Sequence, residues 1–491
     1  MEGQSCDSGP VSTAPTVSAA RTARLVGDLG AARPAYRALA DALRLAVADG
    51  RIAVGTRLPS ERDLTTHLGL SRTTVTRAYD VLRELGYLTS RQGSGSVATL
   101  PDGARRRGTG GLFPADVGDD VLDLTCAATR APAGVLEAYE RALERLPSYL
   151  CGAGYLTYGV PELREAVAER YTARGLPTSA DDVLVTSGAV AGLAVVVRAL
   201  LRPGDRVLVE DPTYPNTLDA LRGAGARLRG LPVDPTGWDV DEAVRTVASA
   251  GARAAVLIPD FHNPTGALLD DEGRARLARA LTAAGTVPVV DETIVEIDLA
   301  GGPMPLPLAA HAPTAVSIGS SSKSHWGGLR TGWVRAPRGA LRALVEARVT
   351  SDLGAPVLEQ LVLVELMRRS PGVTVERRDG LVAARDALAA GLREHLPEAT
   401  FGVPRGGLSL WCELPADLPS SSLAAAAEDE GLLVAAGPRF SLDGGLDRWL
   451  RLPHVLPPET MADAAARLGR AAERVRAGRA ARVRPGRPLV A

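Results

Sequence analysis

The chain has 491 residues, 45% of them hydrophobic, and its 56 basic and 57 acidic side chains leave a formal net charge of −1. This length predicts two or three domains with large cores, and the balanced charge excludes a global field that would attract a nucleic acid or a membrane. The four cysteines are scattered without C-x-x-C spacing, which argues against a disulfide framework and against a zinc site. The N-terminus is polar and no apolar run is long enough to span a bilayer, so we expect a soluble cytoplasmic protein.

The N-terminal region begins with a polar stretch and then becomes helical. Residues 1–33 are rich in Ser, Thr, Ala, Gly and Pro, and we expect a disordered arm there. Apolar side chains then recur at helical spacing from Tyr36 to Ala46, and Gly50 ends this first helix. The first 110 residues carry fifteen arginines against ten acidic residues, an excess of positive charge that suggests nucleic acid.

Two further helices are predicted around a short turn. Ser60 stands three residues before Asp63, which is an N-cap signature, and the helix that it opens ends near Gly69. Ser71 then caps a third helix, and Gly86 has the position of its C-terminal cap. Two helices joined by a four-residue turn predict a helix-turn-helix.

The third helix has two different faces. Its inner face is apolar and is formed by Val75, Ala78, Leu82 and Leu85. Its first turns carry outward polar side chains, which are Arg72, Thr73, Thr74, Thr76 and Arg77. Arginine can bind a guanine edge or a phosphate, and threonine can bind phosphate or contact a thymine methyl group. A hairpin with a glycine tip follows over residues 87–98, in the position of a wing; a small helical bundle with a polar surface is the alternative.

Three motifs in this region carry a family resemblance. The motifs L-P-S-E-R-x-L, L-G-L-S-R-T-T-V-x-R-A-Y and R-Q-G-S-G-S-V lie within residues 34–98, which resemble the winged-helix domain of GntR-type bacterial regulators. The resemblance implies binding to double-stranded DNA at operator half-sites. The DNA contacts that it implies are Arg62, Arg72, Thr74, Thr76 and Gly93. Some relatives have Arg at the position of Thr76, so base preference there is expected to differ.

A second, larger domain follows a linker. Residues 99–119 have linker composition. Over residues 120–480 strand-like and helix-like segments alternate, which predicts an α/β domain with a mainly parallel central sheet, and residues 481–491 are expected to form a tail. The expected strands are Val183–Thr186, Arg206–Glu210, Ala254–Ile258, Val287–Val290 and Ala315–Ile318. In such a sheet, ligands bind at the carboxyl ends of the strands.

The most informative single residue is Lys323, because it is the only lysine among the 56 basic residues. Arginine replaces lysine wherever only a positive charge is needed, but a guanidinium stays charged and cannot attack a carbonyl group. A solitary lysine among small residues therefore predicts a Schiff-base lysine. A surface lysine left by drift is the alternative.

Other polar residues follow the expected strands. Residues 187–189 open a helix with small side chains, where backbone N–H groups can bind a phosphate. Tyr214 lies between two prolines, positioned to stack on a planar ring, although a core tyrosine is the alternative. Asn263 supplies an amide at the end of a strand. Asp291 ends an apolar strand, and burial there requires a cation such as a protonated pyridine nitrogen.

Ser320, Lys323 and Arg330 bring a hydroxyl, an amine and a fixed cation into eleven residues. Together with the preceding residues, in this order, they describe a pocket for pyridoxal 5′-phosphate (PLP), and residues 120–480 resemble a fold-type I aminotransferase. The resemblance implies that Lys323 forms the Schiff base with PLP. The other contacts that it implies are Asp291 at the pyridine nitrogen, Asn263 at the ring hydroxyl, Tyr214 stacked on the ring, and Gly188, Ala189, Ser320 and Arg330 at the phosphate.

The resemblance extends to substrate binding but departs at one position. Arg451, in a Leu-Arg-Leu segment, resembles the arginine that binds a substrate α-carboxylate. Tyr155 would reach the phosphate of the neighbouring subunit, with Tyr158 as the alternative. Active relatives commonly carry Tyr two or three residues after the aspartate, where this chain has Thr293 and Ile294. Efficient transamination is therefore in doubt, whereas cofactor binding is not.

A winged helix fused to an aminotransferase-like domain resembles the MocR subgroup of GntR regulators. This resemblance implies a head-to-tail homodimer whose large domain senses PLP or its adduct with an amine. We therefore hypothesise a PLP-dependent transcriptional regulator whose effector is a small amino compound. A working aminotransferase with an accessory DNA-binding domain, and an aminotransferase fold used only as a dimerisation scaffold, are the alternatives.

Overall fold

The chain folds into two compact units, one within residues 16–99 and one within residues 121–478. The computed structural model describes residues 16–27, 29, 34–48, 52, 55–91, 95–99, 121–234, 236–370 and 373–478. No helix in these ranges is both long enough and apolar enough to cross a bilayer.

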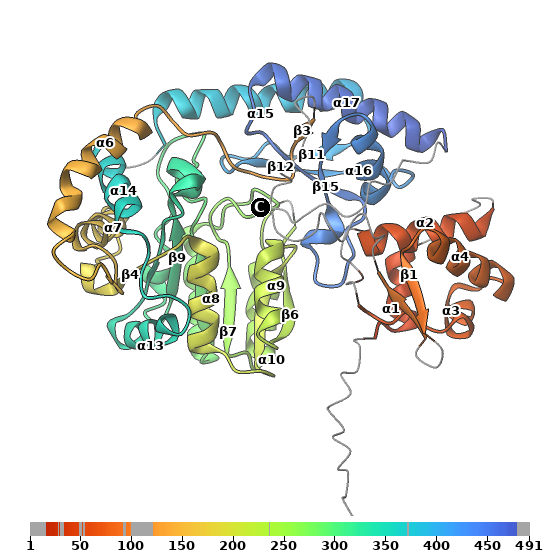
Figure 1. Ribbon diagram of the computed structural model, residues 1–491, viewed down its shortest axis with the longest axis horizontal. Coiled ribbons are helices and arrows are strands. Elements are labelled where there is room, and N and C mark those ends of the chain that lie inside the picture. The colour runs from red at the N-terminus through yellow and green to blue at the C-terminus, as the bar shows by residue number, and fades with distance from the viewer. Residues whose placement is uncertain are drawn as a thin grey trace, which may run out of the picture. The chain divides into compact units, whose positions relative to one another are not determined.

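The smaller unit is a helix-turn-helix followed by an antiparallel hairpin (Figure 1). The predicted caps are confirmed, since the Ser60 side chain accepts a hydrogen bond from the backbone of Asp63 and the Ser71 side chain accepts one from Thr74. Its elements are α1 (Ala19–Val26), α2 (Ala35–Ala48), α3 (Glu61–Leu68), α4 (Arg72–Glu84), β1 (Leu88–Arg91) and β2 (Gly95–Ala98).

Two expectations about this unit are wrong, the first of them over residues 19–26 only, since residues 1–15 lie outside the described part of the chain. Helix α1 lies within the stretch expected to be a disordered arm; Ser18 caps it, and Leu25 is buried in the same core as α2, α3 and α4. The few apolar residues of α1 suffice because they pack on a core that already exists. Leu85 is 48% exposed instead of lining the inner face of α4, because the helix ends at Glu84.

The larger unit is built on a seven-stranded sheet with the order β4-β10-β9-β8-β7-β5-β6. All pairs are parallel except those of β10, which runs antiparallel to β4 and β9, so the prediction of a mainly parallel sheet is confirmed. Only residues 321–331 connect β9 to β10, too few for a crossover to a parallel neighbour. The strands are β4 (Val183–Thr186), β5 (Arg206–Asp211), β6 (Arg227–Pro232), β7 (Ala254–Leu257), β8 (Val287–Asp291), β9 (Val316–Ser320) and β10 (Gly332–Arg335).

Helices cover both faces of this sheet, which is why its central strands read as continuous apolar runs. Leu184 and Val256 face one apolar cluster, whereas Val185 and Leu257 face the other. The first face is covered by α8 (Ala189–Leu200), α9 (Pro215–Gly223) and α13 (Arg338–Val349). The second is covered by α6 (Val135–Arg145), α7 (Pro161–Ala173), α10 (Val240–Ala250), α11 (Asp271–Ala283), α12 (Leu308–His311) and α14 (Val357–Arg369).

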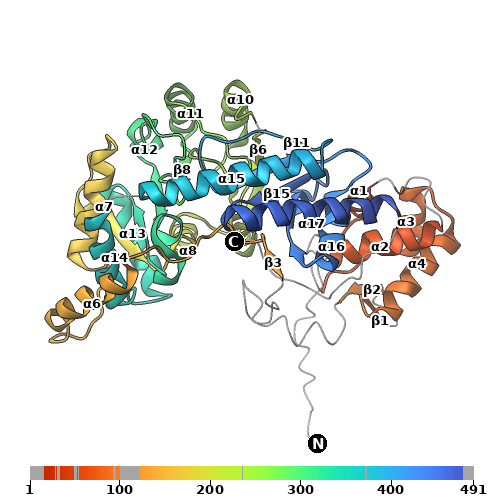
Figure 2. The ribbon, with the colours of Figure 1, turned by 90° about the horizontal axis from the view of Figure 1, so that it is seen from above.

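The C-terminal part of the larger unit has its own antiparallel sheet and core. Its sheet has the order β11-β12-β15-β14, and the two long helices α15 and α17 lie side by side against it (Figure 2). The short strand β3 (Leu122–Asp123) pairs with β13 (Leu432–Leu433), so the beginning of the unit joins this part. The remaining elements are β11 (Thr400–Phe401), β12 (Ser409–Glu413), β14 (Ala435–Ala436), β15 (Trp449–Pro453), α15 (Val375–His395), α16 (Ser420–Asp429) and α17 (Pro458–Arg476).

Candidate cofactor-binding site

The expected phosphate-binding residues meet at one corner of the large sheet. In β10, Gly332 pairs with Thr186 at the end of β4 and with Ser320 at the end of β9. This register brings the two strand ends together although they are more than 130 residues apart in the sequence. The first turn of α8, opened by Gly188 and Ala189, therefore lies near Ser320.

Gly188 lies close to the Arg330 guanidinium, and we term these two residues the cradle. The φ of Gly188 is +96°, and a Cβ atom there would lie 3.1 Å from Arg330 Nη2. The Arg330 guanidinium also donates to the carbonyl oxygen of Ser187 at 3.4 Å. No side chain caps the N-terminus of α8, so its backbone N–H groups are available to an anion beside this cation. The corner thus has the charge and the backbone donors that a phosphate requires.

Replacing Gly188 with alanine should therefore damage the site. The variant places a side chain in a backbone region that strongly favours glycine, which costs about 1–3 kcal/mol of stability, and fills the cradle. We expect a lower melting temperature and at least tenfold weaker PLP binding, measured by absorbance titration. Gly204→Ala is the matched control, because φ is +92° there and no heavy atom lies within 4 Å of the added Cβ. Equal PLP affinity in the two variants would contradict the cradle.

The expected ring-binding residues converge at the ends of neighbouring parallel strands. Tyr214 follows β5, Asn263 follows β7 and Asp291 ends β8, and these strands are adjacent in the sheet. The Tyr214 hydroxyl accepts a hydrogen bond from Asn216 Nδ2 at 2.7 Å. Burial raises the pKa of Tyr214 to about 12, and the Asp291 carboxylate adds to this shift.

Lys323 lies beside these groups, in a short π-helix at residues Ser322–Trp326. Burial lowers the pKa of Lys323 from its ordinary value of 10.5. The cations Arg451 and Arg330 act in the same direction, whereas Cys126 and Asp291 oppose it. A lowered pKa favours the neutral amine, the form that attacks a carbonyl group.

Asp291 is the acidic counterpart in the same pocket. Burial raises the pKa of the Asp291 carboxyl from 3.8, while the Lys323 cation opposes this shift. The backbone N–H of Thr293 donates to Asp291 Oδ1 at 2.9 Å and orients the carboxyl group. A half-buried carboxyl group with a raised pKa suits a cationic partner such as a protonated ring nitrogen.

Arg451 is fully buried on β15 and connects three parts of the unit. Its guanidinium donates to Asn263 Oδ1 at 3.3 Å and to the carbonyl oxygen of Thr125 at 2.5 Å. The Phe440 ring lies 5.1 Å from the guanidinium carbon. Burial lowers the pKa of Arg451 to about 10, so the group remains a cation near neutral pH. This position is next to Asn263, where a ligand carboxylate could meet it.

Tyr155 stands apart from the other expected site residues. It is 69% exposed on the surface of this chain, and Tyr158 is 39% exposed, with the Arg164 guanidinium 5.4 Å from its ring. The structure of one chain therefore does not bring either tyrosine into the pocket.

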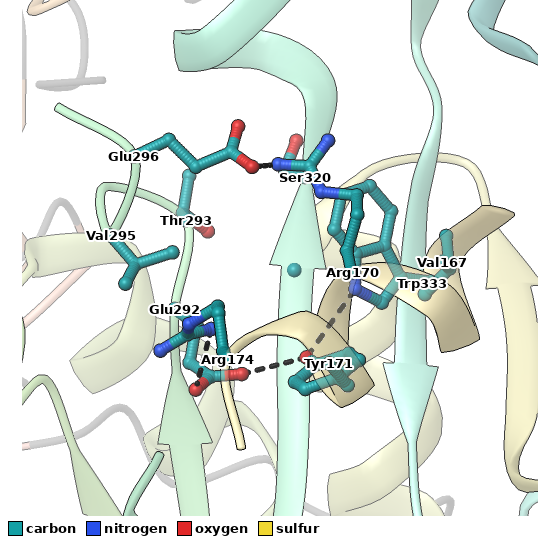
Figure 3. A pocket seen from close by; sticks show the side chains of 11 residues that line it. Val167, Arg170, Tyr171, Arg174, Glu292, Thr293, Val295, Glu296, Ser320 and Trp333 are labelled. Carbon is teal, nitrogen blue, oxygen red and sulfur yellow. Dashed lines mark hydrogen bonds and ion pairs between the residues drawn. The ribbon is translucent and has the colours of Figure 1, made fainter. Parts of the chain in front are cut away.

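Behind the cofactor site, a small second pocket contains Thr293, one of the two residues at the position of the usual tyrosine (Figure 3). Tyr171 from α7 donates to Glu292 Oε2 at 2.6 Å and accepts from Trp333 Nε1 at 3.4 Å. Arg174 Nη1 pairs with Glu292 Oε1 at 3.3 Å. These bonds tie α7, the end of β8 and β10 together behind Asp291.

Two residues near the site were missed by the sequence reasoning. Burial raises the pKa of the Cys126 thiol, whereas the nearby cations of Lys323 and Arg451 lower it. Arg377 donates to the carbonyl oxygen of Lys323 at 3.0 Å. Neither residue stands in a recognisable motif, and both approach Lys323 from parts of the chain remote in sequence.

In the smaller unit, three of the five expected DNA contacts lie in the first turns of α4, and Arg62 lies in α3. Arg62 and Arg72 are exposed, whereas the Thr74 hydroxyl lies 2.8 Å from Ser71 Oγ as part of the cap. The Thr76 hydroxyl donates to Glu61 Oε2 at 2.6 Å, so it already has a partner within the unit. Gly93 lies outside the described residues.

Comparisons with known proteins agree with this division. Residues 35–97 match the gntR family of bacterial regulatory proteins, and residues 151–468 match the aminotransferase class I and II family. The chain is 32% identical over 295 residues to a 2-aminoadipate transaminase of Thermus thermophilus, covering 59% of this chain and 73% of that protein. A crystal structure of LysN, an α-aminoadipate aminotransferase from Thermus thermophilus complexed with N-(5′-phosphopyridoxyl)-L-leucine, covers 77% of this chain and 98% of that one, with 29% identity and a TM-score of 0.67.

A further relative spans both units. The probable rhizopine catabolism regulatory protein MocR of Rhizobium meliloti is 30% identical to this chain over 437 residues, which cover 83% of this chain and 87% of that protein. The large unit has the fold of PLP-dependent aminotransferases, and the small unit is a GntR-type DNA-binding domain. The chain therefore belongs to the MocR subgroup of GntR-family transcriptional regulators.

Proposed function

We propose that this regulator binds PLP at Lys323 and that its DNA binding responds to PLP or to an amine that reacts with it. The observation that supports this most strongly is that the only lysine lies within electrostatic reach of both Asp291 and Arg451 in one partly buried cluster. The donors and the cradle at Gly188 and Arg330 supply the matching place for a phosphate.

Each part of the pocket has a separate task in this proposal. When bound, PLP supplies an aldehyde that condenses with amines and a ring that withdraws electrons. Lys323 supplies the neutral amine, and Asp291 holds the proton on the ring nitrogen. Asn263 orients the ring hydroxyl and Tyr214 covers the ring, while Ala189, Ser320 and Arg330 hold the phosphate with Gly188.

We further propose that an effector carboxylate binds Arg451 and that two chains form a head-to-tail dimer, with Tyr155 of one chain near the phosphate of the other. The effector must bind the two states of the dimer with different affinities, because equal affinities would shift nothing. DNA footprinting at the promoter of its own gene tests this, without PLP, with PLP, and with PLP plus amino acids. Protection that changes with PLP supports the proposal, and identical protection under all three conditions contradicts it.

We propose Arg62, Arg72, Thr74, Thr76 and Gly93 as DNA contacts, and Arg72 gives the sharpest test. If Arg72 binds a guanine edge through two hydrogen bonds, Arg72→Ala should weaken specific binding by roughly 1–3 kcal/mol and relax base preference at one position. Arg342→Ala, which removes an exposed arginine from the large unit, is the matched control. An unchanged footprint and affinity for Arg72→Ala would contradict the assignment.

The second candidate function is transamination, which the similarity to an aminoadipate aminotransferase favours. The chain retains the lysine, the aspartate and the arginine that such a reaction uses, but has Thr293 and Ile294 where active relatives carry tyrosine. A steady-state assay with amino donors and keto-acid acceptors separates the two functions. Sustained turnover without sequence-selective DNA binding would favour the enzyme over the regulator.

A further inference from the structure

The segment that carries Lys323 has an unusual backbone. It is a π-helix of five residues, Ser322–Trp326, followed by a 3-10 turn at Gly327–Leu329 and by Arg330 at φ +48°. π-helical segments are rare and are found mostly at functional sites. A helix this short depends on partners outside itself to hold its backbone groups.

Arg377, at the start of α15, supplies such partners. Its guanidinium donates to three consecutive carbonyl oxygens of the π-helix, which belong to Lys323 at 3.0 Å, Ser324 at 2.7 Å and His325 at 3.0 Å. Three carbonyl dipoles converge on one cation, and its planar fork restricts their geometry. The position of the Lys323 backbone is thereby fixed relative to α15.

The same guanidinium also holds the first segment of the large unit. Its Nη2 donates to Thr129 Oγ1, at the end of residues 121–129, which we term the strap. The strap begins with β3, and near its middle the Thr125 carbonyl oxygen accepts the 2.5 Å hydrogen bond from Arg451. Between these two points Ala127 is buried against Leu381 of α15. The strap therefore joins Arg451 to the residue that holds the Lys323 backbone.

We propose that Arg377 is a positioning residue for Lys323 and that, with the strap, it couples Lys323 to the effector carboxylate at Arg451. A carboxylate that replaces the Thr125 carbonyl oxygen at Arg451 releases the strap at that point. The released strap moves Thr129, and its hydrogen bond to Arg377 shifts the Arg377 guanidinium. The coupling rests on the proposed function, because it requires PLP at Lys323 and an effector at Arg451. The positioning of Lys323 by Arg377 does not require either ligand.

The first experiment needs no cofactor, because Lys323 is the only lysine of the chain. An amine-reactive reagent applied to the PLP-free protein at a series of pH values, followed by peptide mass spectrometry, gives the titration midpoint of Lys323 alone. In the wild type we expect a midpoint below 10.5. In Arg377→Gln the released segment should let water reach the amine, so the midpoint should move toward 10.5.

Arg467→Gln is the matched control. Arg467 also donates to two backbone carbonyl oxygens, those of Glu430 and Gly431 at 3.2 and 3.1 Å, but in the C-terminal part of the unit. It should lower the melting temperature by a similar amount and leave the Lys323 midpoint unchanged. Equal midpoints in the wild type and Arg377→Gln would overturn the inference, as would an equal shift in Arg467→Gln.

The second experiment adds PLP and follows visible absorbance. Arg377→Gln should bind PLP at least tenfold more weakly than the wild type, and Arg377→Lys should recover part of this loss because an ammonium still donates to carbonyl oxygens. Thr129→Val keeps the guanidinium and breaks only its bond to the strap. Thr129→Val should bind PLP normally, but added amino acids should no longer change its spectrum. A wild-type response to amino acids would overturn the coupling. This test remains decisive if Arg377→Gln does not fold.

Failure of the proposed function and failure of the inference about Arg377 give different experimental results. If wild-type protein shows no visible band with PLP, the proposed function fails, while the Lys323 midpoints still decide the role of Arg377. If the wild type binds PLP and Arg377→Gln binds it equally well, the inference fails and the proposed function stands.

Discussion

Lys323→Arg is expected to abolish the visible absorbance that PLP gives with this protein. The substitution keeps a positive charge in the pocket, but a guanidinium remains protonated and cannot condense with an aldehyde. The footprint of the variant should therefore be the same with and without PLP, whereas its melting temperature without PLP should remain close to that of the wild type. Absorbance titration, footprinting and thermal unfolding on one preparation test all three expectations.

The control for this variant introduces a second lysine, which is informative because the chain has no lysine other than Lys323. Arg342→Lys places a new lysine on the exposed surface of α13, where Arg342 pairs with Glu346 at 3.0 Å. This lysine should add no specific visible band to that of the wild type. A band that persists in Lys323→Arg would contradict the assignment of Lys323.

Asp291→Asn is expected to cause the second largest loss. An asparagine keeps the size of the side chain but cannot pair as an anion with a protonated ring nitrogen. A hydrogen bond to a charged group contributes about 1.5–3 kcal/mol, so PLP affinity should fall roughly 10- to 150-fold. Asp298→Asn is the matched control. Asp298 lies on the loop after β8, and its carboxylate binds Arg405. This variant should retain wild-type PLP affinity in the same titration.

Asp291→Asn is expected to weaken PLP binding but not to lower the thermal stability of the PLP-free protein. Because burial raises the pKa of Asp291 in the folded state, the folded protein holds this proton to higher pH than the unfolded chain does. Stability then falls as pH rises from 3.8 through the folded-state pKa. Asp291→Asn removes this cost, so at pH 7 it should unfold at the same or a higher temperature than the wild type. This difference should shrink in acid, and a strongly destabilised variant at pH 7 would contradict the account.

Much of the fold was readable from the sequence because five of the seven strands of the large sheet are short, largely apolar runs bounded by polar residues. Val183–Thr186 is found at the predicted residues, and Val287–Val290 is extended by one residue to Asp291. The edge strand β6 was missed, because Arg227 and Arg229 alternate with smaller residues and give no apolar run. Strand β10 was missed because it lies antiparallel between β9 and β4, and the path of the chain from β9 into this position is defined only in the folded sheet.

The convergence of the proposed site residues at one edge of the sheet was predictable for a different reason. Ligands gather at the carboxyl ends of parallel strands, so side chains such as Asn263 and Asp291 can be placed before the sheet order is known. Arg377 could not be found in this way. It acts through a guanidinium on backbone carbonyl oxygens, which any sequence supplies, and it reaches them from a helix more than fifty residues away. Thr76 shows the converse, because its motif predicts a DNA contact while its hydroxyl donates to Glu61.

The central claim is that PLP condenses with the single lysine of this chain. Incubation with PLP, reduction with sodium borohydride and peptide mass spectrometry tests it most directly, because reduction makes the bond permanent. The account predicts one modified peptide, carrying the phosphopyridoxyl group on Lys323. A chain without modification, or one modified only at its N-terminal amine, would contradict it.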